Sequence, residues 1–201
     1  SLIDFIKRNS ITSTIKMKKL VILSFSIFLL SVNANSLENK KMKNFYDLIV
    51  SDLSGKKVRL EKFRGKKIML VNVASKCGYT PQYKGLQSLY EKYSKEIEII
   101  GIPCNDFGRQ EPGTSTEIEK FCSINYGISF TMLEKQSSKG KNKSNLFEWL
   151  SDPKLNGWNS ESPSWNFCKY IINENGDLTH FFQSNVIPNS SKVKQALGVI
   201  D

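Results

Sequence analysis

The sequence predicts an α/β domain with a mixed central sheet, and three observations support this fold class. Residues 68–74 form a short run that is apolar on both faces and rich in β-branched side chains, which is typical of a buried parallel strand. Residues 82–95 then place apolar side chains at helical spacing, and residues 97–102 have the character of the next parallel strand. Near the C-terminus, Asn175-Gly176 separates two apolar runs, which indicates an antiparallel hairpin.

The other elements follow from local signals. Residues 45–52 alternate enough for a strand, and residues 57–60, after the turn signal Ser54-Gly55, are expected to return as the second arm of a hairpin. Residues 103–113 are rich in proline and glycine and are expected to form a loop. The capping pattern Thr114-Ser115-Thr116-Glu117 then predicts a helix over 115–124. Two further helices are expected at 144–150 and 191–197.

The net charge of +10 does not indicate a nucleic-acid partner. Basic residues outnumber acidic ones by 29 to 19. Part of the excess lies in the first 34 residues, and the remaining lysines are scattered without a basic stripe between aromatic residues. We therefore expect a solvated basic surface and no nucleic-acid site.

The N-terminal region has the three parts of a secretory signal peptide. Met17-Lys18-Lys19 supplies the charged start, residues 20–30 the apolar run, and Val32-Asn33-Ala34 the small-residue cleavage site. The run is shorter than the ~20 residues of a membrane-spanning helix, and no cysteine follows it closely, so we expect no stable membrane anchor. Residues 1–34 are thus interpreted as an upstream extension and signal peptide, 35–44 as a polar leader, and 45–201 as the domain. The expected location is the bacterial periplasm or cell envelope.

Cys77 is the first candidate for chemistry. It lies where the central strand ends and where Thr80-Pro81 signals a helix start, and sites in α/β sheets form at the carboxyl ends of strands. A helix N-terminus and the neighbouring Lys76 would favour the thiolate, which is the nucleophilic form. A buried structural cysteine is equally consistent with the position alone. No Cys-x-x-Cys pair is present, so neither a zinc ribbon nor a thioredoxin-type redox pair is expected.

Three segments carry a family resemblance. They are Asn-Val-Ala-Ser-Lys-Cys-Gly-Tyr-Thr at residues 72–80, Gly-Ile-Pro-Cys-Asn-Asp-Phe-Gly-Arg-Gln-Glu-Pro-Gly at 101–113, and Trp-Asn-Phe at 165–167. In their order and spacing these segments resemble the motifs of the glutathione peroxidase family. The resemblance covers about residues 43–200. It implies a thioredoxin-like fold with a mixed central sheet, flanking helices and an N-terminal β-hairpin. It also implies a thiol peroxidase that reduces hydrogen peroxide and organic or lipid hydroperoxides, with no cofactor and no metal.

The resemblance assigns the reaction to four residues. Cys77 would attack the peroxide bond, while Gln110, Trp165 and Asn166 would supply N–H donors that hold the thiolate and stabilise the departing oxygen. Taken singly, each of the three donors has an ordinary interpretation as a loop residue, a core aromatic residue or a cap.

Cys122 resembles the resolving cysteine of thioredoxin-dependent members, which traps the sulfenic acid as a disulfide. Its alternative interpretation is a buried helix cysteine. Cys104 is expected to be structural, and Cys168 receives no role. Asp106 stands where the family usually has Gln, and the region before Trp165 is shorter than in tetrameric, glutathione-preferring members. These departures favour a monomer and a thioredoxin-like reductant, with glutathione left open.

Two other functions compete with this interpretation. A Cys-His hydrolase would have to use His180, the single histidine, which is far in sequence from any partner motif. A non-catalytic peroxide sensor or redox relay on the same fold is the main alternative, and the intact set of motif residues argues against it.

Overall fold

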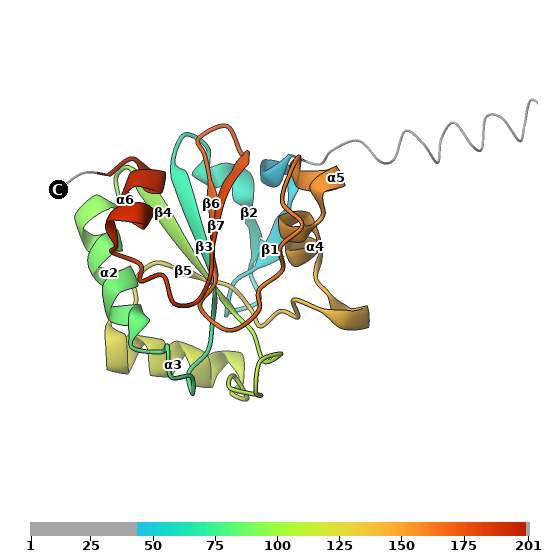
Figure 1. Cartoon of the computed structure of the whole chain (residues 1–201). Coiled ribbons are helices and arrows are strands. Elements are labelled where there is room, and N and C mark those ends of the chain that lie inside the picture. Colours follow the sequence, from blue (N-terminus) through green and yellow to red (C-terminus); the bar gives the residue numbers. More distant parts are fainter. Residues whose placement is uncertain (1–43, 200–201) are drawn as a thin grey trace, which may run out of the picture. The chain divides into compact units, whose positions relative to one another are not determined.

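The computed structural model describes residues 44–199, which form a five-stranded mixed sheet in the order β5-β4-β3-β6-β7 (Figure 1). The predicted signal peptide and most of the leader lie outside these residues. The central strand β3 pairs in parallel with β4, which pairs in parallel with β5. On its other side β3 pairs antiparallel with β6, which pairs antiparallel with β7. The strands are β3 (Lys67–Val73), β4 (Ile97–Pro103), β5 (Thr131–Met132), β6 (Lys169–Ile172) and β7 (Leu178–Phe182).

Helices cover both faces of the sheet, as Figure 1 shows. Alternate residues of β3 enter two separate apolar layers: Met69 and Val71 pack with α2, α3 and α6, and Ile68 and Leu70 pack with α4 and the β1–β2 hairpin. Over residues 44–199 no helix has the length and apolarity that a bilayer crossing requires. The helices are α2 (Gln82–Tyr93), α3 (Ser115–Tyr126), α4 (Asn145–Ser151), α5 (Pro153–Asn156) and α6 (Ser191–Leu197), and the hairpin strands are β1 (Ile49–Ser51) and β2 (Lys57–Arg59).

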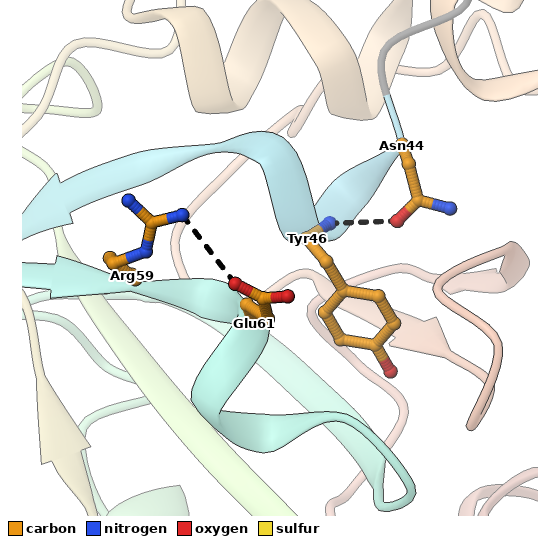
Figure 2. Close-up of polar contacts among 4 residues, drawn as sticks. All are labelled: Asn44, Tyr46, Arg59 and Glu61. Atoms are coloured by element: carbon orange, nitrogen blue, oxygen red, sulfur yellow. Dashed lines mark hydrogen bonds and ion pairs between the residues drawn. The ribbon is translucent and has the colours of Figure 1, made fainter.

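The first predicted strand, 45–52, is only partly a strand. Residues Phe45–Asp47 form a 3-10 turn, η1, and β1 begins at Ile49. The Asn44 side chain accepts a hydrogen bond from the Tyr46 N–H at 2.9 Å (Figure 2), and the Asp47 carboxylate accepts one from the Asn44 N–H at 3.1 Å. This capping box stabilises the turn in place of extended backbone.

The second arm of the hairpin ends at Arg59, where a second 3-10 turn, η2 (Leu60–Phe63), begins. The Arg59 guanidinium lies 3.5 Å from the Glu61 carboxylate across this junction (Figure 2). Both side chains are exposed, so the pair contributes at most about 1 kcal/mol. Burial of Leu60 and Phe63 in the apolar layer is the larger contribution to the position of the turn.

Helix α3 confirms the predicted start and extends two residues beyond the predicted end. Thr114 accepts the Glu117 N–H through Oγ1 at 3.3 Å, and Glu117 Oε2 accepts the Thr114 N–H at 2.7 Å. Gly127 ends the helix in the left-handed conformation. The buried side chains of α3 are Ile118 and Cys122, so one narrow face holds the helix against the sheet.

The predicted C-terminal hairpin is confirmed, with its turn at Asn175-Gly176. Gly176 has φ +92°, and a Cβ there would lie 2.8 Å from both Asn44 Oδ1 and the Tyr46 ring. Only glycine can adopt this positive φ without strain and also leave room for the Asn44 and Tyr46 side chains. The β6–β7 turn therefore packs directly against the N-terminal 3-10 turn.

Candidate active site

Asn72 joins the central strand to the third motif segment. It is buried near the end of β3, whose other buried residues are all apolar. Its Nδ2 donates to the Trp165 carbonyl at 2.9 Å, its Oδ1 accepts the Cys168 N–H at 2.9 Å, and its carbonyl accepts the Phe167 N–H at 2.6 Å. The Asn72 side chain thereby fixes the backbone on both sides of Asn166.

The turn that follows β3 presents Cys77. Thr80 Oγ1 accepts the Cys77 N–H at 3.0 Å and donates to the Ala74 carbonyl at 2.7 Å, which closes the turn. The Tyr79 N–H points at the Cys77 Sγ from 3.4 Å. Helix α2 begins at Gln82 with Pro81 as its N-cap, as expected, and the Tyr79 N–H that faces the thiol belongs to the turn just before this helix.

Gln110 is fixed next to this turn. The Lys76 N–H donates to the Gln110 carbonyl at 3.0 Å, which ties the loop after β4 to the residue before Cys77. Asn166 Nδ2 donates to Gln110 Oε1 at 3.0 Å. Because Oε1 is occupied, the Gln110 Nε2 group is the end left to donate to another atom. Asn166 is fully buried, and its Oδ1 has no hydrogen-bond partner within residues 44–199.

Trp165 lies over the same loop with part of its ring exposed. Its side chain is 39% exposed, and its ring centroid lies 6.1 Å from that of Phe107. Gly108 lies next to the indole, since a Cβ there would be 3.4 Å from its far edge, and its φ of +62° favours glycine. The structure thus brings Gln110, Trp165 and Asn166 together beside the Cys77 turn.

Strained backbone flanks two of these donors. Arg109, directly before Gln110, has φ 54°, and Phe167, directly after Asn166, has φ 67°. They are the two non-glycine residues of the described chain in the left-handed region, a conformation that costs about 1 kcal/mol or more. The cost is offset at Phe167 by its short bond to Asn72 and by an edge-on contact with Tyr83.

Cys122 lies apart from the three donors, on α3. Its side chain is 2% exposed, and burial raises the pKa of its thiol to about 11, so the thiol is protonated at neutral pH. It also borders a groove of about 610 Å³ formed by α3, β5 and the β1–β2 hairpin. All four cysteines are free thiols.

The buried Cys104 and the half-buried Asp106 form a second cluster that shapes the loop carrying Gln110. The Cys104 thiol donates to Asp106 Oδ2 at 3.4 Å, and burial raises the pKa of this thiol to about 11. Asp106 also accepts the Ser138 N–H at 2.6 Å and the Ser137 hydroxyl at 3.1 Å. Although burial opposes it, these hydrogen bonds lower the pKa of Asp106. The contacts fit the structural role expected for Cys104.

Two further residues receive no part in the site. The Cys168 thiol is buried and lies 3.5 Å from the Ser184 hydroxyl. The His180 ring stacks on Phe182 and contacts the Thr179 hydroxyl at 3.0 Å. These neighbours do not form the Cys-His pair that a hydrolase needs.

Sequence reasoning missed Lys169 as a residue that organises this region. Its ammonium is fully buried and donates to Gln82 Oε1 at 2.6 Å, to the Phe167 carbonyl at 2.8 Å and to the Val186 carbonyl at 2.5 Å. Burial lowers its pKa to about 8. The available signal was a charged residue at the start of an apolar strand, and the polar, uncharged Asn72 gave a similar signal within β3.

Comparison with known proteins identifies the family. The family model for glutathione peroxidase matches residues 45–151. Glutathione peroxidase-like peroxiredoxin 2 of Saccharomyces cerevisiae is 40% identical over 148 residues, which cover 73% of this chain and 91% of the relative. The chain belongs to the glutathione peroxidase family. A glutathione peroxidase homolog, BsaA, of Bacillus subtilis is 41% identical over 146 residues, covering 72% of this chain and 91% of the relative.

Solved structures confirm the thioredoxin-like fold expected for a glutathione peroxidase. The crystal structure of Trgpx in its apo form has a TM-score of 0.60 and 30% identity, covering 79% of this chain and 97% of that one. A thioredoxin-like protein from Aeropyrum pernix has a TM-score of 0.53 at 17% identity, covering 85% of this chain and 99% of that one, and shares the fold alone. Membership of the family makes the chain a peroxidase of the oxidoreductase class.

Proposed function

We propose that this glutathione peroxidase reduces hydrogen peroxide and organic or lipid hydroperoxides through Cys77. The observation that supports this most directly is the hydrogen bond between Asn166 and Gln110 beside the Cys77 turn. It leaves Gln110 Nε2 available as a donor in a region that also contains the exposed part of Trp165.

The first step is attack by the Cys77 thiolate on the peroxide O–O bond. The sulfur forms a bond to one oxygen and becomes a sulfenic acid, and the other oxygen leaves as hydroxide or alkoxide and takes up a proton. Gln110 and Trp165 stabilise the negative charge on the departing oxygen through their N–H groups, and Asn166, whose Nδ2 bonds to Gln110 Oε1, holds the Gln110 amide in place. Such fixed donors act in a water-poor site where each is worth more than in water.

The second step is resolution by Cys122. Its sulfur attacks the sulfenic sulfur of Cys77, forms a disulfide and releases water. A thioredoxin-like dithiol, or alternatively glutathione, then reduces the disulfide by thiol–disulfide exchange. The peroxiredoxin name of the yeast relative supports the dithiol. We further propose that the protein acts as a monomer after export to the periplasm or cell envelope.

The test is peroxide reduction by the Cys77→Ser variant, with Cys168→Ser as the matched control. Both residues are buried thiols. Cys77 belongs to the proposed site and has the Tyr79 N–H directed at its sulfur, whereas Cys168 has no part in that site. NADPH-coupled assays with a thioredoxin system and a glutathione system, run side by side, should show no turnover for Cys77→Ser and near-normal turnover for Cys168→Ser. Undiminished turnover of Cys77→Ser would refute the assignment.

The same assay separates the peroxidase from a sensor. A protein that takes up one equivalent of peroxide but turns over with neither reductant would fit a non-catalytic peroxide sensor or redox relay instead.

A further inference from the structure

Glu111 is a fully buried carboxyl group that the steps described so far do not use. Its side chain has no exposed surface, and neither of its oxygens has a hydrogen-bond partner within residues 44–199. The Ser75 side chain and backbone lie close enough to favour the carboxylate, yet the Ser75 hydroxyl is also without a partner there. Burying an unpaired carboxyl group is costly, so its retention calls for a reason other than stability.

Glu111 is one of the residues that line a cavity between the two proposed reacting segments. This cavity has a volume of about 310 Å³. It lies between the turn that presents Cys77 and helix α3, which carries Cys122. Its walls include Ser75, Lys76, Pro112, Glu117, Ile118 and Phe121 together with Glu111.

The walls of this cavity do not include Cys122, which borders the larger groove, but they come close to it along α3. Ile118 lines the cavity, and Cys122 lies one helical turn further along the same buried face. Glu111 lies within electrostatic range of both the Cys122 thiol and the Tyr83 hydroxyl. The fully buried Tyr83 hydroxyl adjoins the thiol without forming a hydrogen bond of ordinary geometry. Glu111 is therefore a buried carboxyl group between the segment that precedes Cys77 and the helix that carries Cys122, and it can accept a proton.

We propose that Glu111 accepts the proton of the Cys122 thiol as α3 opens and lets the Cys122 sulfur attack oxidised Cys77. This role rests on the function proposed above. The Cys122 S–H bond breaks, its proton goes to the Glu111 carboxylate, and the sulfur electron pair forms the bond to the sulfur of Cys77. The S–O bond of the sulfenic acid breaks at the same time, and hydroxide leaves and takes up a proton to give water. Cys122 is oxidised, Cys77 is reduced, and Glu111 afterwards releases its proton to solvent.

The charged and titratable groups around Glu111 fit this role. Burial raises the pKa of Glu111, while Ser75, Lys135 and Lys76 lower it. Glu117 of α3 borders the same cavity, and Tyr83 and Cys122 face the carboxyl group from α2 and α3. A carboxylate with a raised pKa is a stronger base, and the Cys122 thiol, whose pKa is about 11, is almost fully protonated at neutral pH.

The experiment compares Glu111→Gln with Glu98→Gln. Glu98 is also a buried carboxyl group with a pKa raised by burial, but it lies on β4 and bonds to Thr131. Rapid mixing with one equivalent of hydrogen peroxide, followed by acid quench and thiol mapping, gives separate rates for Cys77 oxidation and for disulfide formation. Both rates are measured from pH 6 to pH 9, with thermal melts to verify folding.

Glu111→Gln should slow disulfide formation at pH 7 by roughly 10²-fold or more while the oxidation of Cys77 stays near normal. The deficit should shrink about tenfold per pH unit, because the variant depends on spontaneous ionisation of the thiol. Glu98→Gln should behave like the wild type. In the wild type the rate of disulfide formation should level off once Glu111 is ionised.

Equal pH profiles of disulfide formation for Glu111→Gln and the wild type would overturn the proposed role of Glu111 and leave the proposed resolving step in place. So would a wild-type rate that rises tenfold per unit up to pH 9, a result that does not depend on the variant folding. Absence of any peroxide-dependent disulfide between Cys77 and Cys122 in the wild type would instead overturn the proposed resolving step together with this inference.

Discussion

At the scale of single residues, Trp165 allows the hydrogen-bond donor to be separated from the ring. Trp165→Phe retains an aromatic ring that can pack on Phe107 but removes the indole N–H. If that N–H stabilises the leaving oxygen, the variant should oxidise Cys77 more slowly by roughly 10²–10³-fold, as Gln110→Ala should. Stopped-flow mixing with hydrogen peroxide measures this rate.

Trp158→Phe is the matched control for that measurement. The Trp158 indole donates to the Leu178 carbonyl, at the start of β7, and its side chain is 51% exposed. Loss of the Trp158 N–H should leave the rate of Cys77 oxidation unchanged. A normal rate in Trp165→Phe, with a slow rate in Trp165→Ala, would show that the ring acts by packing alone.

The residues that hold the site in place were harder to predict than those proposed to react. Gln110, Trp165 and Asn166 were selected from their motifs, and the structure brings them together. Asn72 and Lys169 were not selected. Asn72 bonds to the backbone of Trp165 and Cys168, 93 and 96 positions away, and Lys169 bonds to the Gln82 side chain, 87 positions away, and only the folded chain brings these groups near. Glu111 lies within the second motif segment, but its burial without a hydrogen-bond partner is a property of the fold.

At the scale of elements, α3 is expected to move when the protein is oxidised. A disulfide needs the two Cα atoms within about 7 Å, whereas Cys122 is buried inside a helix and Cys77 lies in a turn after the central strand. Only Ile118 and Cys122 are buried along α3, so its detachment costs far less than global unfolding. We predict a Cys77–Cys122 disulfide and faster amide exchange over about residues 114–127, with the central sheet unchanged.

Peptide mapping after one equivalent of peroxide and hydrogen-exchange mass spectrometry test this prediction. Cys122→Ser should still consume one equivalent of peroxide but should fail to turn over with thioredoxin. Normal turnover of that variant, or a disulfide from Cys77 to Cys104 or Cys168, would show that a different residue resolves the sulfenic acid.

The elements themselves were largely predictable, since their signals are local. The strand 68–74, the cap at Thr114 and the turn at Asn175-Gly176 each depend on residues within a few positions, and all three were confirmed. Residues 45–52 were assigned wrongly in part. Their alternating pattern matched a strand, but the side chain of Asn44, just outside the pattern, stabilises a 3-10 turn instead.

At the scale of the whole molecule, the N-terminal pattern leads to a prediction about the mature protein. We predict cleavage after Ala34, because a short apolar run after Lys18-Lys19 precedes a small-residue site. N-terminal sequencing of the protein from the cell envelope should begin at Asn35. A mature form that retains Met17, or one found only in the cytosol, would contradict export.

Arg109 and Phe167, the two residues with left-handed backbone conformation beside the donors, differ in how readily evolution can replace them. Arg109 is solvent-exposed, so glycine there would remove the strain without loss of a buried side chain. Phe167 has the same backbone conformation, but its ring is fully buried and packs on Tyr83. Glycine at 167 would leave a cavity whose cost exceeds the relief of strain. Selection for heat resistance can therefore replace Arg109, which precedes Gln110, by glycine. Phe167, which follows Asn166, is retained because its ring fills space in the core.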